Sequence, residues 1–207
     1  MFKELCATLF LLCNPMLNGF DFSYDINPKD QFVQGIAECT ILNNSVIEPQ
    51  HRVVVVISVA QAILESDWGQ SRFATEANNY YGIIETDNTE PHIKSLNSDV
   101  LLRMYGNRCE SVADYIALLN TSSAFKEYRE IRIKQFIDDN VKVNDVIESL
   151  ENYAIDPEYT EKLLMVTLGL FQKYPYIFQY RSFLSPIFSM FIHTMPIHMG
   201  LYKNVKE

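Results

Sequence analysis

Apolar residues recur at helical spacing along most of this chain, and the pattern predicts a mainly α fold. The segment 31–46 is expected to form a first helix, which Pro49 prevents from continuing. Three later helices are indicated by sets of apolar positions: Val112, Ile116 and Leu119; Val143, Val146, Ile147 and Leu150; and Leu163, Leu164, Val166, Leu170 and Phe171. Asn144 is the expected cap of the second of these helices, and Asp156 with Pro157 is expected to begin the third.

Two segments depart from this helical pattern. Between residues 83 and 105, short apolar groups at Ile84, at 92–93 and at 100–102 are separated by polar turns, which predicts short strands. The segment 53–66 is ambiguous by local signal. Its four consecutive valines favour a strand, whereas its length and its Ala-Gln-Ala-Ile-Leu-Glu continuation favour a buried helix.

The composition bounds the size and the partners of the protein. A chain of 207 residues, 48% of them hydrophobic, can bury one sizeable core, and no second full domain is indicated. The net charge of −9 argues against nucleic acid as a partner, because phosphate binding needs clustered Lys and Arg. A glycan would have to be recognised by hydrogen bonds and aromatic stacking, for which 12 Tyr and 13 Phe are available.

The two ends of the chain differ from its middle. Residues 1–19 contain an apolar run of the length found in secretory signals, so we expect a signal peptide, with a buried N-terminal helix as the alternative. A lead segment at 20–50 then precedes a main domain at 51–175. Residues 176–207 form an aromatic-rich extension that we expect to pack on the domain, with contact of 176–192 with a membrane surface as the weaker alternative.

Cysteine and histidine positions point to no metal and no cofactor. Cys39 and Cys109 lie outside the candidate signal, and their spacing leaves both a disulfide and free buried thiols open; we expect free thiols. The histidines show no metal-ligand spacing except the loose pair of His193 and His198, so we expect no bound metal.

Glu65 lies at the end of the most apolar stretch of the chain and is the only acid in it before Asp67. Apolar surroundings make a carboxyl costly to ionise and raise its pKa toward neutrality. This is the profile of a general acid. From its position alone, a Glu at a helix end that points into water is an equally good interpretation.

Four sequence blocks, in one order, carry a resemblance to a known family. They are residues 62–83, with Glu65-Ser66, Trp68-Gly69, Asn78-Asn79 and Gly82; residues 103–105 together with 110–115; residues 119–125; and residues 153–163, with Tyr153 and Tyr159. Together they resemble the bacterial β-N-acetylglucosaminidase domain, glycoside hydrolase family 73, in its branch of Bax-like and flagellar peptidoglycan hydrolases. Two departures, Tyr81 and Leu102 at positions where the family commonly has Phe, concern packing rather than chemistry.

The resemblance implies a lysozyme-like, mainly α domain with a small β-hairpin lobe beside a cleft, and it favours a helix for 53–66 that ends near Gly69. It also implies hydrolysis of β-1,4 bonds after N-acetylglucosamine in peptidoglycan, at the cell envelope, in the periplasm or outside the cell. Glycan strands are then the partner. Glu65 matches the catalytic acid of the family, and Tyr153 and Tyr159 match tyrosines that line its cleft.

Several of these positions have a competing structural interpretation. We assign Tyr153 to catalysis and Ser66, Asn79, Tyr81 and Tyr159 to substrate binding. As alternatives, Ser66 is an ordinary helix-end serine, Asn78 and Asn79 hold the turn between helix and lobe, and the tyrosines are core residues. Trp68 and Phe73 are expected to pack beneath the Glu65 helix.

The group that stabilises the positive charge on the sugar is left open. In the family this role belongs to an acid of the lobe or to the N-acetyl group of the substrate. The lobe offers Glu85, Asp87, Glu90 and Asp99, of which Glu85 and Asp99 are favoured. Two alternatives to a hydrolase are open: a lytic transglycosylase, which needs only one carboxyl, and a glycan-binding protein that catalyses no reaction.

Overall fold

The computed structural model describes residues 27–96, 98–137 and 142–175. In these ranges the chain is mainly helical, with one two-stranded antiparallel sheet, so the predicted fold class is confirmed. The predictions for residues 1–19 and for the extension 176–207 lie outside the described residues. Among the described helices, none combines the length and the apolar character that crossing a membrane requires.

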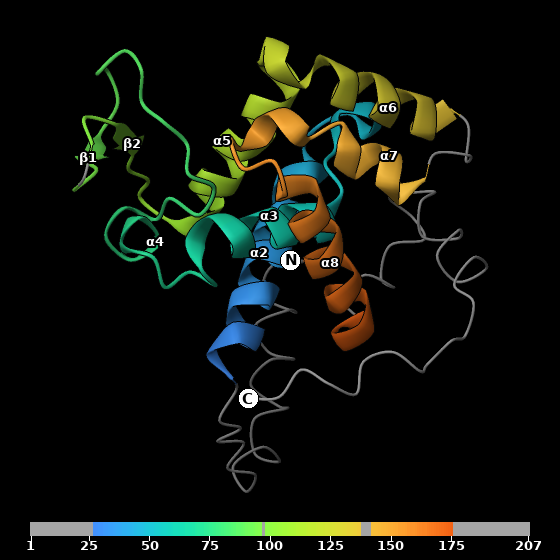
Figure 1. The fold of residues 1–207 in the computed structure, drawn as a ribbon, viewed down its shortest axis with the longest axis horizontal. Helices are drawn as coiled ribbons and strands as arrows, with labels where there is room; N and C mark the ends of the chain where they lie inside the picture. The colour runs from blue at the N-terminus through green and yellow to red at the C-terminus, as the bar shows by residue number, and fades with distance from the viewer. Residues whose placement is uncertain (1–26, 97, 138–141, 176–207) are drawn as a thin grey trace, which may run out of the picture.

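The ambiguous valine-rich segment is a helix, α3 (Val55–Ser66). Every residue of its first nine is buried. A helix that is apolar on all sides has to be surrounded, and here α2 (Pro28–Ser45) and α8 (Tyr159–Lys173) pack against it. In Figure 1, α3 lies in the middle of the molecule, with α5 (Arg108–Thr121) also nearby. Tertiary burial therefore overrides the strand preference of the valines.

The first helix begins three residues earlier than the apolar pattern predicts. Pro28 occupies its first turn, where the missing N–H costs nothing, and the side chain of Asn27 accepts a hydrogen bond from the Lys29 N–H at 2.9 Å. Helix α2 also packs against α5.

A disulfide joins α2 to α5 through Cys39 and Cys109. The prediction of free thiols was therefore wrong. The two residues are 70 positions apart in the chain, but the packing of the helices brings their Cα atoms to 4.8 Å, within the range that a disulfide spans.

Two predicted helix starts were also wrong. Asn144 lies inside α7 (Val143–Glu148), and it is the side chain of Asp145 that accepts the Lys142 N–H at 3.2 Å. Helix α8 begins at Tyr159 rather than at Pro157, because Asp156 caps a separate turn by accepting the Glu158 N–H at 3.0 Å.

The spacing identified the interior faces of the later helices correctly. In α8, Leu163 and Leu170 are buried, and Leu164, Val166 and Phe171 are partly buried against the core. The pattern missed α4 (Arg72–Ala77) and α6 (Lys126–Ile137), and three short 3₁₀ turns, η1 (Pro49–His51), η2 (Ser123–Phe125) and η3 (Glu151–Tyr153). Helix α6 was missed because the buried side chain of Arg132 interrupts its apolar spacing.

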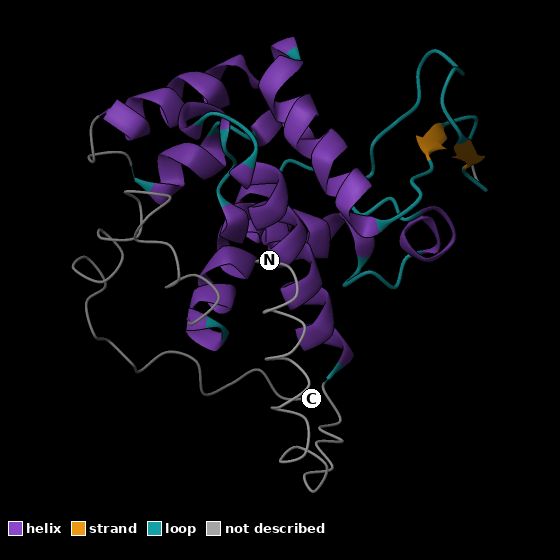
Figure 2. Cartoon of the chain, turned by 180° about the vertical axis from the view of Figure 1, so that it is seen from behind, coloured by secondary structure: helices purple, strands orange, loops and turns teal. Residues whose placement is uncertain are grey.

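The predicted strands form a hairpin lobe. Strand β1 (His92–Lys94) pairs antiparallel with β2 (Leu101–Arg103), and Ile84 forms an isolated bridge with Leu102. Leu102 is buried in the lobe, which agrees with the expectation that this position concerns packing. Figure 2 shows the lobe at the edge of the molecule, connected to the helices by long loops, and α4 contacts β1 there.

Candidate active site

The carboxyl of Glu65 lies where α3 ends and faces the turn at Gly82. A Cβ atom placed on Gly82 would lie 3.3 Å from Glu65 Oε2, and Gly82 has a φ of +65°. The side chain is partly buried. Burial raises the pKa of Glu65 from 4.5 to about 7, and a hydrogen bond from the Tyr159 hydroxyl opposes part of this rise. The carboxyl is therefore partly protonated at neutral pH, as the sequence predicted.

The chain leaves α3 through a left-handed turn. Asp67, Trp68 and Gly69 all have positive φ values, of 49°, 58° and 77°. The hydroxyl of Ser66 donates to the Ala62 carbonyl and accepts from the Gly69 N–H at 2.9 Å. Ser66 is fully buried and closes the helix end, which agrees with its structural interpretation. Trp68 packs against the core, as expected.

Two asparagines hold the lobe beside Glu65. Asn78 adopts a left-handed conformation at the end of α4 and donates to the Tyr105 carbonyl at 3.0 Å. Asn79 is buried and forms hydrogen bonds with both the N–H and the carbonyl of Ile83, at 3.0 and 2.9 Å, and with the Arg103 carbonyl at 3.0 Å. This confirms that the pair fixes the turn between helix and lobe through side-chain to backbone bonds.

Two tyrosines, Tyr153 and Tyr159, form a wall next to Glu65. The rings of Tyr153 and Tyr159 are nearly parallel, with centroids 5.9 Å apart, and the Tyr153 hydroxyl donates to the Tyr81 carbonyl at 2.9 Å. Burial raises the pKa of both Tyr153 and Tyr159, and the nearby Glu65 raises them further. Both hydroxyls therefore stay protonated and can act as donors.

Tyr81 points into the core. Its ring stacks on Tyr115 at a centroid distance of 4.0 Å, and its hydroxyl is 2.8 Å from the Ser58 hydroxyl, which in turn lies 2.9 Å from the Thr40 hydroxyl. The side chain is 1% exposed. The hydroxyls of Tyr81, Ser58 and Thr40 thus form a buried hydroxyl chain.

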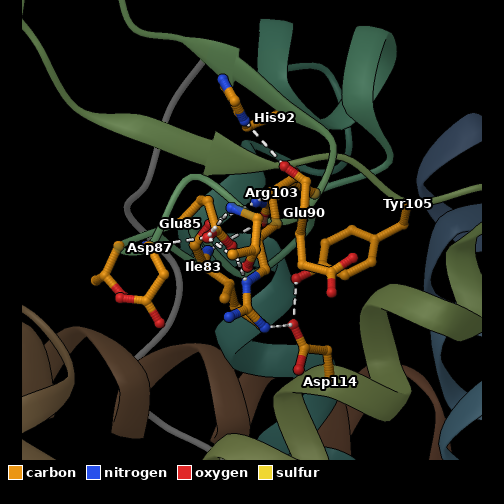
Figure 3. A network of polar contacts seen from close by, with 11 residues as sticks. Ile83, Glu85, Asp87, Glu90, His92, Arg103, Tyr105 and Asp114 are labelled. Carbon is orange, nitrogen blue, oxygen red and sulfur yellow. Dashed lines mark hydrogen bonds and ion pairs between the residues drawn. The ribbon is translucent and has the colours of Figure 1, made fainter.

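Glu85 lies at the centre of an ion-pair network under the lobe (Figure 3). Its Oε2 accepts from Arg103 Nε at 2.9 Å, and Arg103 also reaches Asp114 at 2.9 Å. Its Oε1 accepts the N–H groups of Asp87 and Thr89 at 3.0 and 3.2 Å. Burial alone would raise the pKa of Glu85, but these N–H groups and the guanidinium outweigh it and hold the pKa below its ordinary value. Glu85 is an ionised carboxylate with both oxygens occupied.

The other three lobe acids are exposed. Asp99 forms an ion pair with Lys94 at 2.7 Å, with its side chain in solvent. Asp87 and Glu90 are exposed on the loop before β1. Within the described residues, no group of three or more His, Cys, Asp and Glu is arranged to hold a metal ion.

The structure thus gathers part of the predicted site and separates the rest. The residues around the Glu65 carboxyl and its turn are Ser66, Asn79, Tyr81, Tyr153 and Tyr159. Glu85 and Asp99 belong to the lobe. The substrate-binding roles of Ser66, Asn79 and Tyr81 stay predictions, and in this structure their side chains are buried.

A cavity of about 580 Å³ lies elsewhere, between the end of α2, η1 and α5, and no residue of the predicted site lines it.

Gln61 is the site residue that the sequence reasoning missed. It is fully buried in α3, one turn before Glu65, and its Nε2 donates to the Tyr159 hydroxyl at 2.8 Å. The signal was present in the sequence, because an amide inside an otherwise apolar helix needs a polar partner.

Comparison with known proteins supports one family. Residues 44–168 match the family model described as mannosyl-glycoprotein endo-β-N-acetylglucosaminidase. The chain is 28% identical over 170 residues to the exo-glucosaminidase LytG of Bacillus subtilis, covering 75% of this chain and 57% of LytG. The chain thus spans little more than half of that relative.

Solved structures with the same fold include two bacterial domains. The catalytic domain of the autolysin Auto from Listeria monocytogenes has a TM-score of 0.56 at 18% identity, over 87% of this chain and 98% of that domain. The glycoside hydrolase domain of FlgJ from Salmonella typhimurium has a TM-score of 0.55 at 21% identity, over 81% of this chain and 99% of that domain. At these identities the likeness establishes the lysozyme-like fold.

Proposed function

Because the chain belongs to the mannosyl-glycoprotein endo-β-N-acetylglucosaminidase family, we propose that it is a peptidoglycan hydrolase that cleaves the β-1,4 bond after N-acetylglucosamine. The observation that carries this proposal is the Glu65 carboxyl, whose pKa is raised by burial to about 7 beside a wall of tyrosines. The proposed place of action is the cell envelope, in the periplasm or outside the cell.

Glu65 is the general acid of the proposed reaction. Glycoside cleavage needs a proton on the departing oxygen, and an acid with a pKa near the working pH delivers it most effectively. Only the protonated form can act, so activity should fall as the pH rises through about 7. Tyr159 and Tyr153 both interact with the carboxyl, and their rings stack with centroids 5.9 Å apart. We assign the half-buried Tyr153 ring to the surface that receives the sugar, whereas the Tyr159 ring, 4% exposed, supports it from the core by stacking.

The N-acetyl group of the substrate is the proposed second catalytic group. Glu85, a favoured acid of the lobe, has both oxygens engaged and its side chain 1% exposed. Asp99, the other favoured acid, is paired with Lys94 in solvent. Neighbouring-group participation needs no second carboxylate and is a recognised route of glycoside hydrolysis.

Four single substitutions separate the two routes: Glu85→Gln, Asp87→Asn, Glu90→Gln and Asp99→Asn. With substrate assistance, Asp87→Asn, Glu90→Gln and Asp99→Asn stay within a few-fold of wild type, and an N-acetylglucosamine-thiazoline analogue inhibits strongly. The alternative outcome is that one variant loses most activity while it still folds and binds oligosaccharide, and that the thiazoline analogue does not inhibit. The acid replaced in that variant is then the second catalytic group.

Digestion of purified sacculi tests the function itself. Wild-type protein should release fragments with N-acetylglucosamine at the reducing end, and Glu65→Gln should release almost none. Internal fragments indicate endo cleavage, whereas release from chain ends alone would resemble the activity named for LytG.

A lytic transglycosylase is the second candidate, favoured by the single carboxyl next to the tyrosine wall. It would leave 1,6-anhydro-muramyl ends, which the same mass analysis detects. If the protein binds sacculi but cleaves none, the enzyme proposal is rejected in favour of a glycan-binding protein.

A further inference from the structure

A buried hydrogen-bond chain runs from the core to the Glu65 carboxyl. The Tyr115 hydroxyl donates to Gln61 Oε1, Gln61 Nε2 donates to the Tyr159 hydroxyl at 2.8 Å, and the Tyr159 hydroxyl lies beside the Glu65 carboxyl and lowers its pKa. Gln61 and Tyr115 are fully buried, and Tyr159 is 4% exposed. Gln61 and Glu65 are four residues apart on α3 and so lie on one face of the helix, opposite the start of α8.

The carboxylate determines the direction of this chain. An ionised Glu65 can only accept hydrogen bonds, so the Tyr159 hydroxyl stabilises it only when its single proton points at the carboxylate. The Tyr159 oxygen is then free to accept, and Gln61 presents an N–H to it. The amide can present its N–H there only if its oxygen faces Tyr115, which donates to that oxygen. Each partner therefore fixes the orientation of the next.

We propose that Gln61 is a positioning residue, which holds the Tyr159 hydroxyl so that its proton is directed at the Glu65 carboxyl. This inference rests on the proposed role of Glu65 as general acid. Without the amide, the Tyr159 hydroxyl keeps its place in the wall but loses the partner that selects its orientation. The ionised carboxylate then has a weaker donor.

Few other groups compete for this role. Among the described residues, the titratable side chains that interact with the Glu65 carboxyl are Tyr159 from α8 and Tyr153 from η3. Tyr153 is committed to the Tyr81 carbonyl at 2.9 Å. The turn on the opposite side presents Gly82, which has no side chain.

Gln61→Met tests the proposal, because it keeps the length of the side chain and removes both amide groups. A hydrogen bond to the ionised form lowers the pKa of an acid, so its loss should raise the pKa of Glu65 by about half to one pH unit. The pH at which activity falls, on the alkaline side of the pH–activity profile, should rise by the same amount. The direct measurement is a ¹³C-carboxyl NMR titration, in which Glu65→Gln identifies the resonance.

Thr40→Val is the matched control. Thr40 is fully buried and its hydroxyl is part of the other hydroxyl chain, which leads to Tyr81 and not to Glu65. Both substitutions should lower the melting temperature, but only Gln61→Met should move the Glu65 titration.

Two further variants show whether Gln61 acts through the tyrosine. Tyr159→Phe should shift the titration at least as far, and adding Gln61→Met to it should produce no further shift. Tyr115→Phe should shift the Glu65 titration in the same direction by a smaller amount. This variant replaces Gln61→Met as the test if Gln61→Met does not fold. The proposal would be overturned by an unchanged Glu65 titration in Gln61→Met, or in Tyr115→Phe if that variant has to replace it. Additive shifts in the double variant would overturn it as well. A shifted titration in a protein that cuts no sacculi would retain the positioning role and reject the hydrolase.

Discussion

Glu65→Gln should make the protein more stable at alkaline pH while removing its activity. In the unfolded chain the carboxyl ionises near 4.5, and in the folded protein near 7. Below 4.5 it is protonated in both states and imposes no cost. As the pH rises from 4.5 through 7, the folded state loses stability, because it alone resists ionisation. The difference in pKa corresponds to roughly 3 kcal/mol, which is the full cost above pH 7.

The substitution replaces this carboxyl by a group that never ionises. Its new packing and hydrogen bonds change stability by an amount that does not depend on pH. The free energy of unfolding of the variant, relative to wild type, should therefore rise by up to roughly 3 kcal/mol between pH 4 and pH 9. Activity on sacculi should fall by about 10²–10⁴-fold, because the transferable proton is gone.

Urea unfolding at a series of pH values measures the effect, with the relative stability of the two proteins plotted against pH. Glu127→Gln is the matched control, because Glu127 is exposed at the start of α6 and water already solvates its charge. Its relative stability should change little across the series. A curve for Glu65→Gln as flat as that of the control would refute the buried carboxyl, and full activity would refute the general acid.

Three further outcomes are expected. Reduction of the disulfide between α2 and α5, which closes a loop of 70 residues, should lower the free energy of unfolding by about 4 kcal/mol in guanidinium titrations; an unchanged midpoint would contradict this. Gly82→Ala should lower both activity and melting temperature, because it places a Cβ atom 3.3 Å from the Glu65 carboxyl at a residue with positive φ. The control is Gly169→Ala in α8, where a Cβ atom meets no neighbour, and this variant should have a slightly raised melting temperature. Arg103→Met alone should lower the melting temperature more than Arg103→Met combined with Glu85→Gln, because the single variant leaves a carboxylate without its counter-ion; equal losses would mean that the ion pair contributes little.

Much of the site could be predicted from local sequence. The segment around Glu65 combines an apolar helix, an acid and a left-handed exit turn within 15 residues, and all three follow from short-range pattern and resemblance. The direction of the Glu65 pKa shift was predicted from the apolar segment that carries it, whereas its cause, burial of the carboxyl, also depends on the tertiary packing of Gly82 and Tyr159 around it. The short strands of the lobe were predictable from the loss of helical spacing between 83 and 105.

Helix starts were less predictable, because several neighbouring side chains could cap each one. At α8, Asp156 and Pro157 satisfy the expected start signal, yet they form their own turn and the helix begins at Tyr159. The choice depends on where the next helical turn meets the core, which a local pattern does not contain.

Sequence alone therefore determined the mainly α class and the short strands of the lobe, and it pointed to Glu65 as the proposed general acid, because these depend on residues close together in the chain. Only the tertiary structure decided that Cys39 and Cys109 pair, that Glu85 is enclosed by Arg103, and that Gln61 reaches Tyr159. Each of these contacts joins residues at least 18 positions apart. Their distance is fixed by how the helices and the lobe pack, and packing depends on every side chain in the interface at once.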